Sequence, residues 1–158
     1  MAGIKFLVLD VDGVLTDGSM YYGPQGEVLK RFNTKDGMAI KHLRDQGIKI
    51  GFLSAGLSHS KEIVTARAAV FGVEKVYVGT DPKLGVFEGW CEELGIDPSE
   101  TAYMGDDIND LDVIAVAGLT GCPSDAVPKV RAAVDHVLER KGGDACVREF
   151  VDTYISEA

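Results

Sequence analysis

The length, composition and charge of the chain exclude several classes of protein. It has 158 residues, 46% of them hydrophobic, with a formal net charge of -9 and a pI near 4.7. Proteins bind nucleic acids and anionic membranes through clustered Lys and Arg side chains, so this acidic balance argues against both partners. The length predicts a single domain over residues 1–158.

The cysteines and apolar runs predict a cytoplasmic protein. Cys91, Cys122 and Cys146 are odd in number, far apart and without the spacing of a zinc site, which fits a reducing compartment. The apolar run at residues 4–9 is too short for a signal peptide. No stretch reaches the roughly 18 apolar residues of a membrane-spanning helix.

Apolar runs alternate with helix-period segments, which is typical of a parallel sheet with connecting helices. The expected strands are residues 4–9, 48–53, 73–78, 101–104 and 119–122, the last of them the final clear strand. The expected helices are residues 34–46, 60–71, 81–95, 105–118 (after a tight turn), 127–133 and 144–155. Residues 20–22 and 28–32 flank Gly-Pro-Gln-Gly, a turn sequence that predicts a hairpin.

Specific residues are expected to begin, end or pack these helices. Thr34 or Asp36 would cap the first helix, and Met38 would face inward from it. Asp81 would cap the helix at 81–95, and Gly95 would end it.

The stretch FLVLDVDGVLTDG, residues 6–18, carries the first chemical signal. Asp10 and Asp12 follow a buried strand, and Gly13 permits a sharp turn. Residues i and i+2 of an extended chain point the same way, so both carboxylates would face the end of the sheet where ligands bind. Two such charges call for a raised pKa or a divalent cation. Taken alone, the motif also fits a solvated Asp-rich turn.

A second acidic cluster, Asp106, Asp107 and Asp110, follows the expected strand at 101–104. These carboxylates could simply cap the next helix. Two acidic clusters at separate strand ends are less easily attributed to turn chemistry, however, and carboxylate oxygens suit Mg²⁺. We therefore expect the two clusters to converge on a metal.

Lys83 and Ser54 are two further candidates. Lys83 lies in the first turn of a predicted helix, where a cation opposes the helix dipole at a cost of about 0.3–1 kcal/mol. A local rule broken in this way marks a candidate functional residue. Ser54 lies at a strand-to-helix turn that could cradle a phosphate. Each residue alone also fits an exposed lysine or an ordinary turn serine.

The order Asp10-x-Asp12, Ser54, Lys83 and Gly-Asp106-Asp-x-x-Asp resembles the four motifs of the haloacid dehalogenase-like phosphatases, from end to end of the chain. The segments YYGPQGEVLKRFNTKDG and KGGDACVRE are similar to a capless subgroup that acts on nonulosonate sugars. The resemblance implies an α/β fold with a Rossmann-like parallel sheet, helices on both faces and no cap domain. A hairpin would occupy about residues 18–32, and a C-terminal tail about residues 141–158.

The resemblance also implies catalytic roles. Asp10 would be the nucleophile that forms an aspartyl-phosphate, and Asp12 would be the general acid and base. Lys83 and Ser54 would stabilise the phosphoryl group.

A metal site follows from the same resemblance. Mg²⁺ would be held by the side chains of Asp10 and Asp106 and by the backbone carbonyl of Asp12. Asp107 and Asp110 would support these ligands by holding metal-bound water or by orienting the catalytic lysine.

The implied substrate is a phosphorylated 2-keto-3-deoxy sugar acid, first of all 3-deoxy-D-manno-octulosonate (Kdo) 8-phosphate. Neuraminate or deaminoneuraminate 9-phosphate is the alternative, because the loop SAGLSHS at 54–60 lacks the Arg or Glu usual in close relatives. Gly56 and His59 of this loop are candidate sugar contacts. The resemblance further implies a homotetramer, in which Lys141 or Arg148 of the tail reaches a neighbour's site.

Two other classes of protein remain open. A phospho-receiver domain is also small, acidic and α/β, but needs its phosphate-accepting Asp at the end of a later strand. A non-catalytic oligomerisation module with this fold is the second alternative.

Overall fold

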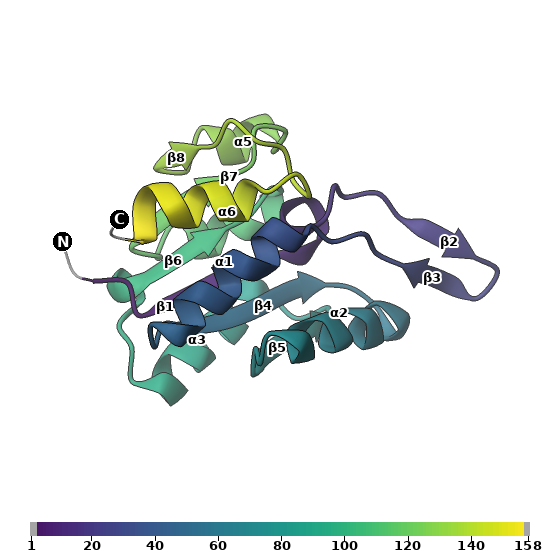
Figure 1. The fold of residues 1–158 in the computed structure, drawn as a ribbon, viewed down its shortest axis with the longest axis horizontal. Helices are drawn as coiled ribbons and strands as arrows, with labels where there is room; N and C mark the ends of the chain where they lie inside the picture. Colours follow the sequence, from purple (N-terminus) through teal and green to yellow (C-terminus); the bar gives the residue numbers. More distant parts are fainter. Residues whose placement is uncertain (1–2, 157–158) are drawn as a thin grey trace.

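The structure, a computed structural model, describes residues 3–156 and contains a six-stranded sheet in the order β5-β4-β1-β6-β7-β8 (Figure 1). All neighbouring strands in this sheet are parallel. The strands are β1 (Phe6–Leu9), β4 (Lys49–Ala55), β5 (Lys75–Gly79), β6 (Thr101–Met104), β7 (Leu119–Cys122) and β8 (His136–Val137). The chain runs from β1 to one side and then returns to β6 on the other side. Open α/β sheets bind ligands at such a switch point, outside the carboxyl ends of the strands.

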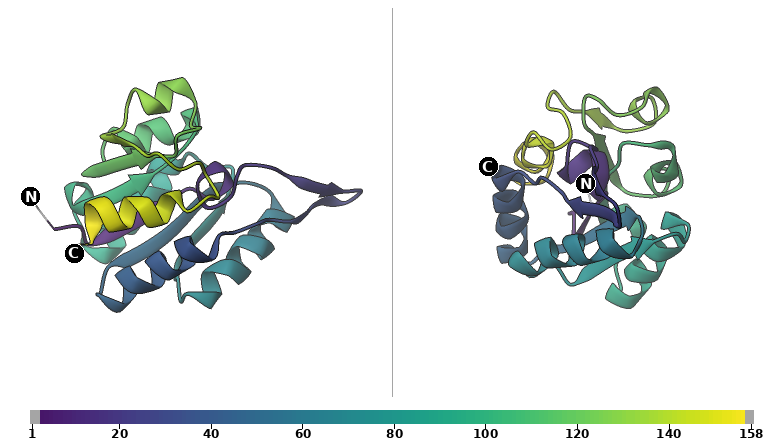
Figure 2. Two further views of the ribbon diagram at one scale, coloured as in Figure 1. Left: turned by 45° about the horizontal axis from the view of Figure 1, so that its top comes forward. Right: turned by 90° about the vertical axis from the view of Figure 1, so that its right-hand side faces the viewer.

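Helices cover both faces of the sheet (Figures 1 and 2). One core contains Leu7 and Leu9 of β1, and the other contains Phe6 and Val8. The first core packs against α1 (Thr34–Asp45), α2 (Ser58–Val70) and α6 (Cys146–Phe150), and the second against α3 (Lys83–Leu94), α4 (Leu111–Ile114) and α5 (Pro128–Arg131). Burial on both faces explains why β1 is a continuous apolar run. The expected fold class is therefore confirmed.

Within residues 3–156, four short turns complete the connections: η1 (Val11–Leu15), η2 (Pro98–Glu100), η3 (Ile108–Asp110) and η4 (Val151–Ile155). Asp10 lies between β1 and η1, and η1 contains Asp12. Asp106 and Asp107 lie between β6 and η3, and η3 contains Asp110.

A two-stranded antiparallel hairpin, β2 (Tyr21–Gly23) and β3 (Gly26–Leu29), projects beyond the carboxyl ends of the main strands (Figure 1). The predicted hairpin is present, although its second strand ends at Leu29 instead of residue 32. Its exposed apolar residues are Met20, Tyr21, Tyr22, Val28 and Leu29.

Three predictions for α1 were wrong. Asn33 caps the helix, because its side chain accepts a backbone N–H in the first turn. Thr34 lies within the helix, and Asp36 accepts the backbone N–H of Arg148 from α6 instead. Met38 is exposed, because the i, i+4, i+7 stripe that α1 buries begins at Asp36.

Two further corrections concern α3 and the sheet edge. Pro82 precedes α3 in the cap position, and the side chain of Asp81 accepts the hydroxyl of Tyr77. Gly95 ends the helix in the left-handed conformation, as predicted. Strand β8 adds an edge strand after β7, and its two residues are too short a run to be recognised in the sequence.

Candidate active site

The candidate site lies where β1 and β6 end side by side. The backbone N–H of Asp10 donates to the carbonyl of Met104 at 3.0 Å, which aligns the two strand ends. Carboxylate oxygens of Asp10, Asp106 and Asp110 all lie within 4.8 Å of one another. A cavity of about 220 Å³ opens beside them, here called the acidic cavity. Its lining residues are Asp10, Asp12, Gly18, Ala55, Asp106, Asp107 and Asn109.

Gly13 permits this close approach of the two strand ends. Its φ is +88°, in the left-handed region, and an added Cβ would lie 1.8 Å from Oδ2 of Asp106. A larger residue would therefore be strained and would also displace the Asp106 carboxylate. The glycine forms a cradle for one of the candidate metal ligands.

Lys83 reaches the site from the first turn of α3. It is buried and donates from Nζ to Oδ1 of Asp10 and to Oδ1 of Asp110, both at 2.8 Å. Burial lowers the pKa of Lys83, but the charges and hydrogen bonds of the two carboxylates raise that pKa further, and it ends above its usual value. The paired carboxylates compensate for the unfavourable helix dipole, so the lysine stays cationic.

The Asp110 carboxylate accepts four hydrogen bonds from the residues around the site. Its Oδ1 accepts hydrogen bonds from Nζ of Lys83 and from the Tyr103 hydroxyl. Its Oδ2 accepts hydrogen bonds from the backbone N–H groups of Asp106 at 2.9 Å and Asp107 at 3.1 Å. It is fully buried. Because these four bonds use the acceptor capacity of a carboxylate, Asp110 orients its neighbours and is a poor candidate ligand.

The electrostatics of the remaining carboxylates favour a cation. Burial and the charge of Asp110 raise the pKa of Asp10 well above its usual value, although Lys83 lowers it. Burial likewise raises the pKa of Asp106 to about 6, against a lowering hydrogen bond from Asp10. One lysine thus faces three buried or half-buried carboxylates. A divalent cation would neutralise this excess, and carboxylate oxygens are the donors that Mg²⁺ prefers.

Asp12 lies at the boundary of the acidic cavity and a second cavity of about 350 Å³, here called the hairpin cavity. Its Oδ1 accepts Nζ of Lys30 at 2.6 Å, and Lys30 also contacts Glu27. The hairpin cavity is lined by Asp12, Met20, Tyr22, Gln25, Gly26, Glu27 and residues 55–60.

The loop at 54–60 forms one wall of the hairpin cavity. Gly56 and His59 line it, as does Ala55, which also lines the acidic cavity. The His59 ring lies against the hairpin turn, since a Cβ added to Gly26 would be 3.3 Å from its Cδ2. Ser54 is buried behind Ala55, and its hydroxyl donates to the Ala55 carbonyl at 3.3 Å.

The C-terminal tail packs on the turn that carries Asp12. A Cβ added to Gly142 would lie 1.9 Å from the carbonyl oxygen of Gly13, and the N–H of Gly143 donates to Val14 at 3.1 Å. Lys141 is exposed, and Nε of Arg148 pairs with Asp152 of the same tail at 2.7 Å. Within one chain, neither cation is brought to the acidic cavity.

Sequence reasoning missed Lys30, Glu27 and Tyr103. Lys30 and Asp12 are 18 residues apart, and their contact depends on how the hairpin folds back. The only signal was the presence of charged residues, Glu27, Lys30 and Arg31, beside the apolar residues of the hairpin segment. Tyr103 has a clearer signal, because its hydroxyl needs a partner in a fully buried strand.

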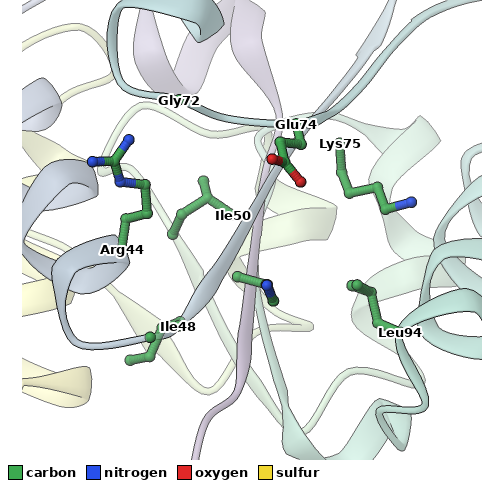
Figure 3. A pocket seen from close by; sticks show the side chains of 9 residues that line it. Arg44, Ile48, Ile50, Gly72, Glu74, Lys75 and Leu94 are labelled. Carbon is green, nitrogen blue, oxygen red and sulfur yellow. The ribbon is translucent and has the colours of Figure 1, made fainter.

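A further hollow, of about 240 Å³, lies at the amino ends of β4 and β5 (Figure 3). Two of its charged groups already have partners: Arg44 donates to the carbonyl of Phe71 at 2.8 Å, and Lys75 pairs with Glu93. This hollow is at the opposite end of the strands from the two acidic clusters. We therefore assign the candidate chemistry to the acidic cavity.

Comparisons with known proteins agree with this assignment. The family model of haloacid dehalogenase-like hydrolases matches residues 27–118. The chain is 38% identical over 152 residues to the 3-deoxy-D-manno-octulosonate 8-phosphate phosphatase KdsC of Haemophilus influenzae, covering 96% of this chain and 83% of that protein. It is also 38% identical over 149 residues to KdsC of Escherichia coli K12, covering 94% and 78%.

Solved structures show the same similarity in three dimensions. The 3-deoxy-D-manno-octulosonate 8-phosphate phosphatase of Yersinia pestis superposes with a TM-score of 0.90 at 36% identity, covering 96% of this chain and 80% of that one. The enzyme of the same name from Moraxella catarrhalis, in complex with magnesium, phosphate and KDO, superposes with a TM-score of 0.88 at 33% identity, covering 94% and 84%.

Proposed function

The chain belongs to the haloacid dehalogenase-like hydrolase family and is a phosphatase, and on this premise we propose that it hydrolyses Kdo 8-phosphate to Kdo and phosphate. The observation that carries this proposal is the meeting of Asp10, Asp106 and Lys83 at the switch point of the sheet. It occurs in a chain similar to Kdo 8-phosphate phosphatases over 96% of its length. We take residues 1–158 as one domain, with the hairpin and the tail as its additions.

The cofactor is Mg²⁺, held by the carboxylates of Asp10 and Asp106 and by the backbone carbonyl of Asp12. The two carboxylates fit this role because they are close, acidic and short of positive charge. When bound, the ion withdraws charge from the phosphoryl oxygens and reduces their repulsion of an anionic nucleophile. Asp107 lines the acidic cavity, and Asp110 fixes the backbone at Asp106 by accepting its N–H.

Catalysis proceeds in two displacements. A carboxylate oxygen of Asp10 attacks phosphorus, an aspartyl-phosphate forms, and the bond from phosphorus to the sugar oxygen breaks. Asp12 gives a proton to the departing alkoxide and then accepts one from the water that attacks the intermediate. Lys83 and Ser54 bind the phosphoryl oxygens, and for this the Ser54 hydroxyl leaves the Ala55 carbonyl to which it donates.

The sugar acid occupies the hairpin cavity, which is next to Asp12 and large enough for a small sugar. Gly56 and His59 contact the substrate there. The loop at 54–60 therefore decides which sugar acid is accepted. This loop contains His59 but not the Arg or Glu that is usual in close relatives.

The active form is a homo-oligomer, which we take to be a tetramer. The protein is located in the cytoplasm. The exposed apolar side chains of the hairpin would be buried between copies of the chain. Lys141 or Arg148 of the tail would contact the substrate carboxylate in a neighbouring subunit. The three free cysteines fit a reducing compartment. None of the helices in the described part of the chain has the length and hydropathy of a membrane span.

The test is phosphate release with Mg²⁺ from a panel of substrates. The panel contains Kdo 8-phosphate, N-acetylneuraminate 9-phosphate, deaminoneuraminate 9-phosphate and hexose phosphates, with Asp10→Asn as the inactive control. We expect the highest kcat/KM for Kdo 8-phosphate and no release after chelation of the metal. A preference for a nine-carbon acid would correct the substrate, and no release by folded, Mg²⁺-loaded protein would favour the non-catalytic module.

A further inference from the structure

We propose that Lys30 is a positioning residue for Asp12, which orients the carboxylate of the general acid and base and connects it to the hairpin. Lys30 directly follows β3. Its Nζ donates to Oδ1 of Asp12 at 2.6 Å and to the two carboxylate oxygens of Glu27 at 2.8 and 3.0 Å. The inference rests on the proposed function, because it assigns Lys30 a part in that reaction.

The burial of this network is unusual for the hairpin. The side chains of Lys30 and Glu27 are 1% and 5% exposed, whereas the apolar side chains of the same hairpin are mostly in solvent. Burying an ion pair costs several kcal/mol of desolvation per ion, and a well-packed apolar pair would anchor the hairpin as well or better. A buried charge network at this place is therefore better explained by the catalytic carboxylate that it contacts.

Lys30 is held between two carboxylates. An ammonium group has three protons, and the contacts to one oxygen of Asp12 and to both oxygens of Glu27 engage at least two of them. Because the side chain has almost no contact with solvent, it cannot exchange these partners for water without moving the hairpin. Glu27 thus fixes Lys30, and Lys30 fixes Asp12.

This arrangement distinguishes the two oxygens of Asp12. Lys30 holds Oδ1, so Oδ2 is the oxygen left to exchange a proton with the leaving alkoxide or with water. A general acid must stay within hydrogen-bond distance of the oxygen that it protonates. Loss of Lys30 would let the Asp12 carboxylate rotate, and protonation of the leaving group would become less efficient.

The test compares Lys30→Met with the parent enzyme on two substrates. Kdo 8-phosphate has a basic alkoxide leaving group that needs a proton, whereas p-nitrophenolate leaves without one. Since kcat/KM reports the steps up to the first irreversible one, the difference isolates the acid step. We expect kcat/KM to fall about 10- to 100-fold for Kdo 8-phosphate, less than the roughly 10²–10⁴-fold that a general acid contributes because Asp12 itself is retained, and by less than about threefold for p-nitrophenyl phosphate.

A double-mutant cycle separates positioning from a purely structural role. In the Asp12→Asn background, Lys30→Met should cause no further loss with Kdo 8-phosphate, because its partner is already inactive. Equal losses for both substrates, or additive losses in the cycle, would overturn the proposal. Lys41→Met is the matched control, since it removes an exposed Lys–Asp pair on α1 and should leave both rates unchanged.

Two further measurements keep the outcome interpretable. If Lys30→Met does not fold, Glu27→Gln replaces it in the test, because this variant retains a hydrogen-bond acceptor for Lys30. We expect Glu27→Gln to show a smaller loss of kcat/KM with the same dependence on the leaving group. An equal loss for both substrates would again oppose the proposal. If the parent enzyme prefers another sugar phosphate, the proposed substrate is wrong. The same comparison with that sugar phosphate then decides the role of Lys30.

Discussion

At the scale of single residues, buried charge is the feature that both builds the site and limits the stability of the protein. Asp110 uses its acceptors on Lys83, Tyr103 and two backbone N–H groups, so its charge is compensated. Asp36 is buried as well, but its Oδ2 has no hydrogen-bond partner. We therefore expect Asp36 to carry a cost that Asp110 does not.

The prediction for Asp36 is a stability change with pH. Burial raises its pKa to about 6, against backbone hydrogen bonds from Arg148 and Val147 that lower it. Between about pH 4 and pH 6 the folded state then binds more protons at this group than the unfolded chain, so its contribution to stability falls as the pH rises. The free energy of unfolding of the parent, relative to Asp36→Asn, should fall by roughly 2 kcal/mol over this range in urea titrations.

Asp45→Asn is the control on the same helix. Asp45 is exposed and pairs with Lys41, and the hydrogen bond from Lys41 lowers its pKa. Its contribution to stability is present above its usual pKa and is lost as the pH falls, so the sign is opposite to that of Asp36. Identical pH profiles for the parent and Asp36→Asn would contradict the assignment.

At the scale of elements, the two turns after β1 and β6 are fitted to each other through glycines. Gly13 in η1 leaves room for the Asp106 carboxylate, and Gly105 leaves room for Asp110. Gly142 of the tail packs in turn on the carbonyl of Gly13. These contacts join three distant segments of the chain at the site, and none of them tolerates an added Cβ without movement.

Gly13→Ala should therefore lose both stability and metal binding. The positive φ and the contact with Asp106 predict a loss of about 1–3 kcal/mol in the free energy of unfolding and a weaker response of the melting temperature to added Mg²⁺. Gly85→Ala in α3 is the matched control, because its Cβ would meet no atom within 4 Å. That substitution should stabilise the protein by about 0.5–1 kcal/mol. The same destabilisation by both variants would argue against a specific contact at Gly13.

Strands β1, β4, β6 and β7 were predictable because each is mostly buried and is bounded by turn residues. Helix stops such as Gly95 were predictable for a similar reason, since a left-handed C-terminal residue is usually glycine. The caps at Asp36 and Asp81 were mispredicted because each carboxylate binds a group from another element. The local sequence indicates which residues can cap a helix, and tertiary contacts determine which of these residues caps it.

At the scale of the whole molecule, strand order brings the two acidic motifs together. Asp10 and Asp106 could be expected to meet from the parallel-sheet pattern alone, since the carboxyl ends of the strands share one edge. The Lys30 network could not, because the position of the hairpin relative to the sheet is not encoded in a local pattern. Five exposed large hydrophobic side chains of the described residues also lie on the hairpin segment: Met20, Tyr21, Tyr22, Val28 and Leu29.

Burial of this hairpin between copies of the chain predicts the behaviour of a surface variant. The combined change Val28→Glu and Leu29→Glu places charge on exposed hairpin positions outside the lining of the hairpin cavity. We expect the parent to sediment as an oligomer and the variant as a smaller species with an unchanged circular dichroism spectrum. A monomeric parent at assay concentration, with full activity, would exclude the proposed assembly.

The most direct measurement of the central claim is the mass of the Asp10 peptide from enzyme quenched in acid during turnover of Kdo 8-phosphate with Mg²⁺. The account predicts a phosphoryl adduct on Asp10 in the parent enzyme and none in Asp10→Asn. It also predicts accumulation of that adduct in Asp12→Asn when a substrate with a good leaving group is used, because water attack then lacks its base. Phosphate release without any adduct on Asp10 in either protein would contradict the account.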